Sequence, residues 1–252
     1  MNGPVRTLVV VPTYNERDNV ALLLTAVRQV LPAADVLVVD DNSPDGTAAL
    51  AESVAAELGQ IKLLRRPGKH GLGSAYRQGF DIGLSNDYDV IVSMDVDLSH
   101  DPAVLPDMLA LLAAGADAVI GSRYVPGGGT VDWPLHRRVL SRWGNRYTSF
   151  VLGLQVRDCT SGYRAYRAGA MRAIDPGTTT AEGYAFLTEL VRRLVGQGFK
   201  VMETPIVFAD RRYGQSKMSG RIIVESMLLV TRWGLSDLLR GRSRRRRSTS
   251  AS

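Results

Sequence analysis

The chain has 252 residues, of which 45% are hydrophobic and 22% are charged, a composition typical of a globular protein with one large domain. The single cysteine, Cys159, excludes an intramolecular disulfide and is typical of a protein from a reducing compartment. No apolar run reaches the roughly 20 residues that a membrane-spanning helix needs, and the first residues do not have the pattern of a secretory signal.

The formal net charge of +6 is concentrated near the C-terminal end. Six of the 31 basic residues are arginines between residues 240 and 247, and the remaining 25 basic residues equal the 25 acidic ones in number. An arginine-rich end is typical of a segment that contacts anionic lipid or nucleic acid, or of a disordered solubilising tail. The balanced remainder argues against nucleic-acid binding by the folded body.

Strand-like and helix-like segments alternate through the first half of the chain. Buried strands are predicted at 7–12, 35–40, 61–65, 90–94 and 117–121, and helices at 19–31, 47–58, 74–84 and 102–114. This alternation predicts an α/β fold with a doubly wound, mostly parallel sheet that is flanked by helices.

The second half is predicted to contain more amphipathic helix. Residues 126–129 and 160–164 are expected to be loops, and residues 201–208 an edge strand that Pro205 interrupts. Helices are predicted at three places, of which the first and the last are amphipathic: 136–152, 183–196 and 221–239.

Two carboxylates, Asp95 and Asp97, follow the apolar strand at 90–94. Ligands bind to open α/β sheets at the carboxyl ends of strands, and two acids so close together repel each other unless a cation lies between them. Carboxylate oxygens suit Mg²⁺ or Mn²⁺, which are usually shared with substrate phosphates. Because a D-x-D pattern is common by chance, solvated acids at a strand end are the alternative, and the neighbouring motifs must decide.

Polar residues also follow the first two strands. Asp41 is placed to accept a hydrogen bond from a nucleotide, whereas Asp40 is expected to stabilise the turn at Ser43. Tyr14 and Glu16 follow the first strand, so they would line the same crevice or else belong to a solvated loop.

Several other motifs are weakened by their context. Gly71 and Gly73 follow the third strand, and Tyr76 stands where a dinucleotide fingerprint needs its third glycine, so a nicotinamide cofactor is not expected. Lys69 in this loop is a point charge that suits a phosphate. The three histidines have no metal-ligand spacing, and Cys159 is expected to be a buried apolar residue rather than a nucleophile.

Seven motifs occur in an order that resembles one enzyme family. They are Val-Val-Pro-Thr-Tyr-Asn-Glu, Val-Val-Asp-Asp-Asn-Ser-Pro-Asp-Gly-Thr, Gly-Leu-Gly-Ser-Ala-Tyr, Met-Asp-Val-Asp-Leu-Ser-His, Gly-Ser-Arg-Tyr, Thr-Ser-Gly-Tyr-Arg and Arg-Tyr-Gly-Gln-Ser-Lys. Over residues 8–217 the chain resembles the polyprenol-phosphate mannosyltransferases of the dolichol-phosphate mannose synthase type. This resemblance implies a GT-A fold, an inverting reaction, GDP-mannose as donor and a divalent metal, Mg²⁺ or Mn²⁺.

The resemblance also implies roles for individual residues. Five would hold the nucleoside: Pro12, Tyr14, Glu16, Val39 and Asp41. Three would contact the donor diphosphate and the metal: Asp95, Val96 and Asp97. Three basic residues would bind phosphates: Arg123, Arg211 and Lys217. Arg137 and Ser141 would meet the phosphate of the acceptor.

Two features depart from the family pattern. Many relatives have glutamine where this chain has Ser99, so Ser99 is expected to reach the metal directly or through a water. The pair of membrane-spanning helices that some relatives carry after the catalytic domain is not apparent in this sequence.

The implied reaction transfers mannose from GDP-mannose to a polyprenyl phosphate and releases GDP. The nucleophile is a phosphate monoester with a second pKa of about 6, so it is anionic at neutral pH without a general base. Basic residues such as Arg137, Arg211 and Lys217 would attract this phosphate to an otherwise acidic site.

We expect a glycosyltransferase domain at 1–217, an amphipathic helix at 218–240 that contacts a membrane interface or a partner, and a disordered arginine-rich tail at 241–252. The expected partners are GDP-mannose, polyprenyl phosphate, a membrane surface at its cytoplasmic face and a membrane-protein subunit.

Three alternatives remain open. The first is glycosyl transfer, such as glucosyl transfer, from a UDP-sugar to the same lipid. The second is a nucleotidyltransferase, although the chain has no glycine-rich basic loop for a triphosphate near its start. The third is a nucleic-acid-binding protein, which would depend on the arginine-rich tail alone.

Overall fold

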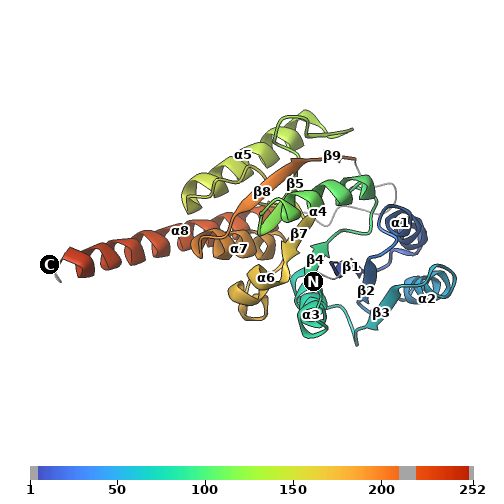
Figure 1. Cartoon of the computed structure of the whole chain (residues 1–252). Helices are drawn as coiled ribbons and strands as arrows, with labels where there is room; N and C mark the ends of the chain where they lie inside the picture. Colours follow the sequence, from blue (N-terminus) through green and yellow to red (C-terminus); the bar gives the residue numbers. More distant parts are fainter. Residues whose placement is uncertain (1–4, 210–219, 250–252) are drawn as a thin grey trace.

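The computed structural model describes residues 5–209 and 220–249, and helices cover both faces of its main sheet (Figure 1). The strands of this sheet are β1 (Thr7–Thr13), β2 (Asp35–Asp40), β3 (Ile61–Arg65), β4 (Val90–Ser93), β5 (Ala118–Ser122), β7 (Arg164–Arg167) and β8 (Val201–Pro205). The helices are α1 (Arg17–Val30), α2 (Thr47–Leu58), α3 (Leu72–Ser85), α4 (Leu105–Ala113), α5 (Leu135–Leu152), α6 (Ala168–Ile174), α7 (Gly183–Gly196) and α8 (Gly220–Thr249), with short 3₁₀ helices η1 (Pro102–Val104) and η2 (Pro176–Thr178).

The strand order is β3-β2-β1-β4-β7-β5-β8. All neighbouring strands in this sheet are parallel except at β7, which is antiparallel to both β4 and β5. The predicted doubly wound, mostly parallel sheet is therefore confirmed, and β8 lies at its edge as the interrupting Pro205 indicated.

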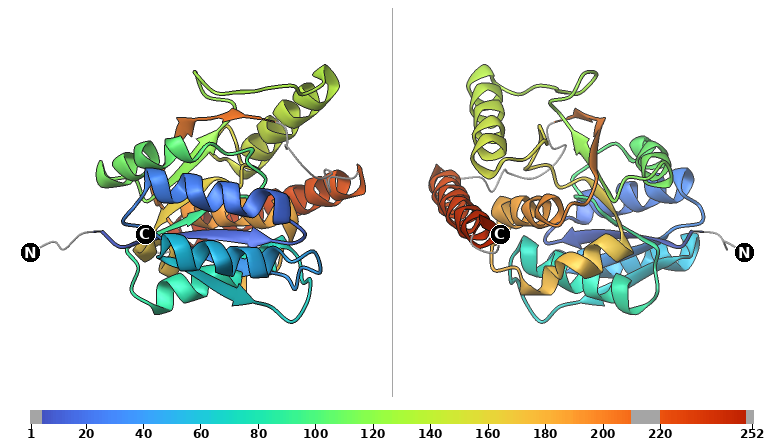
Figure 2. Two further views of the ribbon diagram at one scale, coloured as in Figure 1. Left: turned by 90° about the vertical axis from the view of Figure 1, so that its right-hand side faces the viewer. Right: turned by 60° about the vertical axis from the view of Figure 1, so that its left-hand side comes forward.

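A second, two-stranded sheet lies beside the first and leads into α5. It pairs β6 (Gly129–Thr130) with β9 (Val207–Phe208). Helix α5 begins after Pro134 and ends at Gly153, which has a φ of 63°, a left-handed conformation that glycine adopts without a steric penalty. Helices α5 and α8 lie on the same side of the molecule, away from α1 and α2 (Figure 2).

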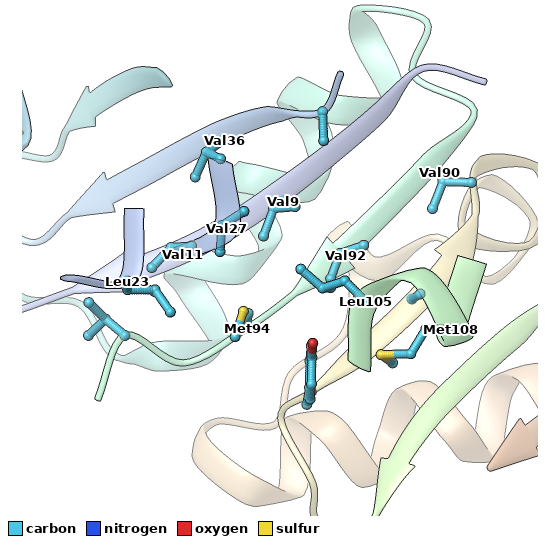
Figure 3. Packing of buried hydrophobic residues seen from close by; sticks show 14 of the residues in the cluster. Val9, Val11, Leu23, Val27, Val36, Val90, Val92, Met94, Leu105 and Met108 are labelled. Carbon is cyan, nitrogen blue, oxygen red and sulfur yellow. The ribbon is translucent and has the colours of Figure 1, made fainter. Parts of the chain in front are cut away.

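The hydrophobic core lies in two layers, one on each face of the sheet. Successive side chains of a strand point to opposite faces, so Val9 and Val11 belong to one layer and Leu8 and Val10 to the other. The first layer packs the sheet against α1 and α4 (Figure 3), and the second packs it against α3 and α7.

Two elements differ from the sequence prediction. Strand β7 and helix α6 were not predicted, because β7 is only four residues long and depends on its two neighbours for hydrogen bonds. The backbone of α8 is helical from Gly220 to Thr249, and the predicted disorder of residues 241–252 stays a prediction. The domain limits at 217 and 240 stay a prediction.

Candidate active site

Asp95 and Asp97 lie directly after β4, where the strand order reverses between β1 and β4. Asp95 accepts a hydrogen bond from the hydroxyl of Tyr76 at 3.1 Å. Oδ1 of the buried Asp97 accepts hydrogen bonds from the backbone nitrogen of Ser99 at 3.2 Å and from its hydroxyl at 2.5 Å. Leu98 has a φ of 60°, which is strained for a bulky residue. This turn holds two carboxylates at the point where doubly wound sheets bind ligands.

The loop at 160–164 lies against Asp95. A Cβ atom at Gly162 would lie 3.2 Å from both carboxylate oxygens of Asp95, so any larger residue would require this carboxylate to shift by a few tenths of an ångström. The hydroxyl of Ser93 donates to the carbonyl of Gly162 at 2.8 Å. The His100 ring stacks on Tyr163 with centroids 5.0 Å apart, and burial lowers the pKa of His100.

The two carboxylates fit a divalent cation that is shared with a substrate. Within residues 5–209 and 220–249, no group of three or more His, Cys, Asp or Glu side chains is placed to hold a metal. Mg²⁺ needs fewer protein ligands than that when one or two carboxylates are joined by phosphate oxygens and waters. The hydroxyl of Ser99 donates a hydrogen bond to Asp97. Ser99 therefore orients the carboxylate of Asp97, both if it ligates a metal directly and if a water lies between.

Asp40 and Asp41, at the end of β2, make different contacts. Asp40 accepts hydrogen bonds from Thr13 Oγ1 at 2.9 Å and from the backbone nitrogen of Ser43 at 2.9 Å, which agrees with its predicted structural role. Asp41 forms a buried ion pair with Arg66 and accepts from the backbone nitrogen of His70 at 3.3 Å. Asp41 therefore follows β2 as a buried carboxylate with its charge compensated.

The other residues predicted to hold the nucleoside lie around the ends of β1 and β2. Lys69 lies over the ring of Tyr14, 4.1 Å from its centroid. The backbone nitrogen of Glu16 donates to Thr47 Oγ1 at 2.9 Å. Pro12 is partly buried in β1. The side chain of Val39 lies in one hydrophobic layer, and that of Val96, which was predicted to contact the donor diphosphate, lies in the other; only the backbones of these two residues can contact a ligand.

Arg123 follows β5 and forms a buried ion pair with Asp158. Its Nε and one terminal nitrogen each donate to an oxygen of Asp158 at 2.7 Å. Burial alone raises the pKa of Asp158, but the charge and hydrogen bonds of Arg123 outweigh this effect and hold that pKa below its usual value. The carboxylate of Asp158 also accepts from the backbone nitrogen of Ser161 at 3.1 Å. The pair thus joins the loop after β5 to the loop at 160–164.

Arg137 and Ser141 lie on α5, one turn apart. The guanidinium of Arg137 lies 3.9 Å from the ring centroid of Trp133, and the hydroxyl of Tyr124 donates to Ser141 Oγ at 2.6 Å. Arg211 and Lys217 lie outside the described residues.

One cleft, with a cavity volume of about 150 Å³, brings together the carboxylates after β4, Arg123 and the two polar residues of α5, whereas the residues predicted to hold the nucleoside do not line it. Its polar part is lined by Asp95, Asp97, His100, Arg123, Arg137 and Ser141. Its apolar part passes between α5 and α8 and is lined by Leu140, Trp143, Met227 and Val230. The cleft can therefore take a molecule with a charged head and an apolar chain.

Sequence reasoning missed two charged residues of this site. Arg66 is the second of two arginines at the end of β3, which lies beside β2 and therefore beside Asp41. Asp158 lies two residues before Thr160, and a carboxylate so close to a polar motif was a usable signal.

Cys159 is buried, and burial raises the pKa of its thiol to about 12, as expected of an inert residue.

Known proteins of similar sequence are glycosyltransferases. The model of glycosyl transferase family 2 matches residues 8–175. A polyprenol monophosphomannose synthase of Mycolicibacterium smegmatis is 48% identical over 235 residues, which cover 93% of this chain and 89% of that protein. An undecaprenyl-phosphate mannosyltransferase of Micrococcus luteus is 47% identical over 232 residues, covering 92% of this chain and 95% of that protein.

Among solved structures, glucosyl-3-phosphoglycerate synthase from Mycobacterium tuberculosis in complex with phosphoglyceric acid has a TM-score of 0.66 at 17% identity, over 90% of this chain and 80% of that one. The same enzyme in complex with Mn²⁺, UDP-glucose and phosphoglyceric acid has a TM-score of 0.65. At this identity the likeness concerns the fold alone. These findings confirm the family resemblance and the GT-A fold that were predicted from the sequence.

Proposed function

The chain belongs to glycosyl transferase family 2, and from this premise we propose that it transfers mannose from GDP-mannose to a polyprenyl monophosphate. The products are polyprenyl-phosphate mannose and GDP. The observation that carries the proposal is a cleft in which a carboxylate pair, two arginines and an apolar passage lie together. The relatives that share nearly half of its residues are named for transfer to, or synthesis of, such lipids.

The donor occupies the crevice at the ends of β1, β2 and β4 in this proposal. Asp41, presented by Arg66, accepts from the N–H groups of guanine, while Tyr14 and Glu16 line the ribose. Asp95 and Asp97 hold Mg²⁺ or Mn²⁺, and Ser99 keeps Asp97 in place. A bound divalent cation neutralises the charge that develops on the departing diphosphate.

The acceptor enters from the opposite, apolar part of the cleft. Its phosphate lies near Arg137 and Ser141, and its polyprenyl chain follows the passage between α5 and α8. A phosphate oxygen bonds to the anomeric carbon as the bond from that carbon to the GDP oxygen breaks, so one displacement inverts the configuration. The residues of this chain position the two phosphates and withdraw charge, since an anionic nucleophile needs no base.

We further propose that the protein works peripherally at the cytoplasmic face of a membrane. Within the described residues, no helix combines the length and the apolar character that crossing a bilayer requires. Large apolar side chains are nevertheless exposed on both helices that border the passage: Leu135, Val139, Leu140, Trp143 and Phe150 on α5, and Val224, Leu228, Leu235, Leu238 and Leu239 on α8. Such helices can lie in the interface. We also propose that a membrane-protein subunit covers part of these exposed apolar side chains.

A transfer assay with a panel of donors tests the function. Purified protein is incubated with polyprenyl phosphate in liposomes and with radiolabelled GDP-mannose, UDP-mannose or UDP-glucose. We expect label in a lipid that mild acid cleaves, and only from GDP-mannose. Transfer from UDP-glucose in its place would establish the alternative, and no transfer from any donor would refute the proposal. Proton NMR of the product distinguishes an inverted from a retained anomeric centre.

A further inference from the structure

Trp133 lies in the cleft in contact with two of the arginines that are expected to bind phosphates, Arg123 and Arg137. The guanidinium carbon of Arg137 lies 3.9 Å from its ring centroid, and that of Arg123 lies 5.6 Å from it. The face of an aromatic ring is electron-rich and attracts cations. One indole can therefore hold two guanidinium groups in a small volume, although their charges repel each other.

The backbone around Trp133 is restrained on both sides. Asp132 before it has a φ of 59°, and Pro134 after it limits Trp133 to extended conformations. The neighbouring Val131 donates its backbone N–H to the carbonyl of Phe208 at 2.9 Å, and the ring of Phe208 meets the indole edge-on at 5.4 Å. The second sheet thus fixes the indole before any ligand binds.

The indole of Trp133 makes its polar contacts through its ring faces, on which the guanidinium groups lie, and not through its N–H. That N–H is buried and finds no hydrogen-bond acceptor among the described residues, whereas buried indoles usually have one. Arg137 also lies in the first turn of α5, where the helix dipole disfavours a cation. Stacking on Trp133 offsets that repulsion.

We propose that Trp133 is a positioning residue that holds the guanidinium of Arg137 over the cleft, beside Arg123, so that it meets the phosphate of the acceptor. This inference rests on the proposed lipid phosphate substrate. Without the indole, the side chain of Arg137 is expected to lose this position over the cleft.

Binding of a short lipid phosphate tests this role without the transfer reaction. Isothermal titration calorimetry with farnesyl phosphate compares wild-type protein with Trp133→Leu and Trp133→Phe. We expect Trp133→Leu to weaken binding about tenfold, the size of a partly desolvated cation–π contact, and Trp133→Phe to restore most of it. In an Arg137→Ala background, Trp133→Leu should cause no further loss, because its effect acts through Arg137. The affinity for GDP, measured by the same titration, should change little.

Trp233→Leu is a matched control, since Arg192 stacks on Trp233 at 5.5 Å but Trp233 does not line the cleft. If Trp133→Leu does not fold, Trp133→Met replaces it. The inference would be overturned if Trp133→Leu bound farnesyl phosphate as tightly as the wild type. It would also be overturned if Trp133→Leu weakened binding as much in the Arg137→Ala background as it does alone. Wild-type protein that transfers no mannose but shows the predicted affinity pattern would refute only the proposed donor reaction.

Discussion

At the scale of single residues, the carboxylates around the cleft divide into two kinds. Asp40 and Asp158 are engaged by hydroxyl, backbone and guanidinium donors and hold loops together. Asp95 and Asp97 line the cleft itself and are oriented by Tyr76 and Ser99. Substitutions in the first group should therefore affect stability, and substitutions in the second should affect catalysis.

Asp97→Ala is expected to lower kcat by about 100-fold or more, as losing the charge stabilisation of a leaving group does, while the melting temperature falls little. Chelation of divalent metal should reduce wild-type activity similarly. Transfer assays and thermal melts measure both effects, with the exposed Asp107→Ala as the control. Full activity of Asp97→Ala in the presence of chelator would contradict the metal assignment.

Asp158→Asn is expected to destabilise the protein by about 3–5 kcal/mol, because it leaves the buried guanidinium of Arg123 without its partner. The folded-state pKa of Asp158 lies below its usual value. Its stabilising effect is therefore present above about pH 4 and is lost as pH falls through the folded-state pKa. Urea unfolding at pH 7 and at lower pH should show the deficit of the variant shrinking with acid. A constant deficit would contradict this account.

At the scale of elements, α5 and α8 form the walls of the apolar passage and touch closely at one point. A Cβ atom at Gly234 would lie 2.5 Å from a methyl carbon of Val151 and 2.7 Å from its carbonyl oxygen. The hydroxyls of Tyr147 and Thr231 join the same helices at 2.6 Å. These two contacts hold α5 and α8 together beside the passage.

Gly234→Ala should force α5 and α8 apart and lower the free energy of unfolding by roughly 1–3 kcal/mol. Because the acceptor chain lies between these helices in our proposal, KM should change for a long polyprenyl phosphate more than for a short one. Gly169→Ala is a suitable control, since a Cβ atom at Gly169 would meet no atom within 4 Å and alanine favours a helix. Equal stability of the two variants would show that the helices are not in close contact.

Arg137→Ala tests the basic end of α5. Exposed or partly exposed arginines contribute little to folding, so the melting temperature should stay nearly constant. The KM for polyprenyl phosphate should rise or kcat should fall, while affinity for GDP should not change. The exposed neighbour Arg138→Ala is the matched control. Normal kinetics of Arg137→Ala at limiting lipid would remove Arg137 from the site.

At the scale of the whole molecule, the passage between α5 and α8 opens beside their exposed apolar side chains. The C-terminal half of α8 extends away from the sheet (Figure 1), and six arginines follow Leu239 in its sequence. Apolar contact and attraction to anionic headgroups would then act on the same helix. This arrangement suits an enzyme that takes its acceptor directly from a bilayer.

Flotation with anionic liposomes tests this orientation. Wild-type protein should float at low salt and less at high salt, because salt screens the arginines. Replacing Leu228 and Leu235 together by serine should weaken flotation at both salt concentrations, whereas Leu22→Ser, a similarly exposed position on α1, should not. Absence of flotation under both conditions, with no membrane partner recovered, would contradict the proposal.

The sequence by itself determined the alternating sheet and the main features of the crevice. Apolar runs marked β1 to β5, and polar motifs directly after them marked Tyr14, Asp41, Asp95 and Asp97. The strand predictions succeeded because hydrophobic periodicity and turn chemistry are local properties. Parallel strands also bring their carboxyl ends, and the polar residues that follow them, to one edge of the sheet.

Only the tertiary structure decided how the remaining groups meet. Strand β7 enters between β4 and β5 and carries Gly162 to Asp95, although the two residues lie far apart in the sequence. Arg123 pairs with Asp158, and Trp133 collects Arg123 and Arg137 with the help of Phe208. Such contacts join residues that are remote in the chain. Their electrostatic attraction becomes strong only after packing has removed the water between the groups.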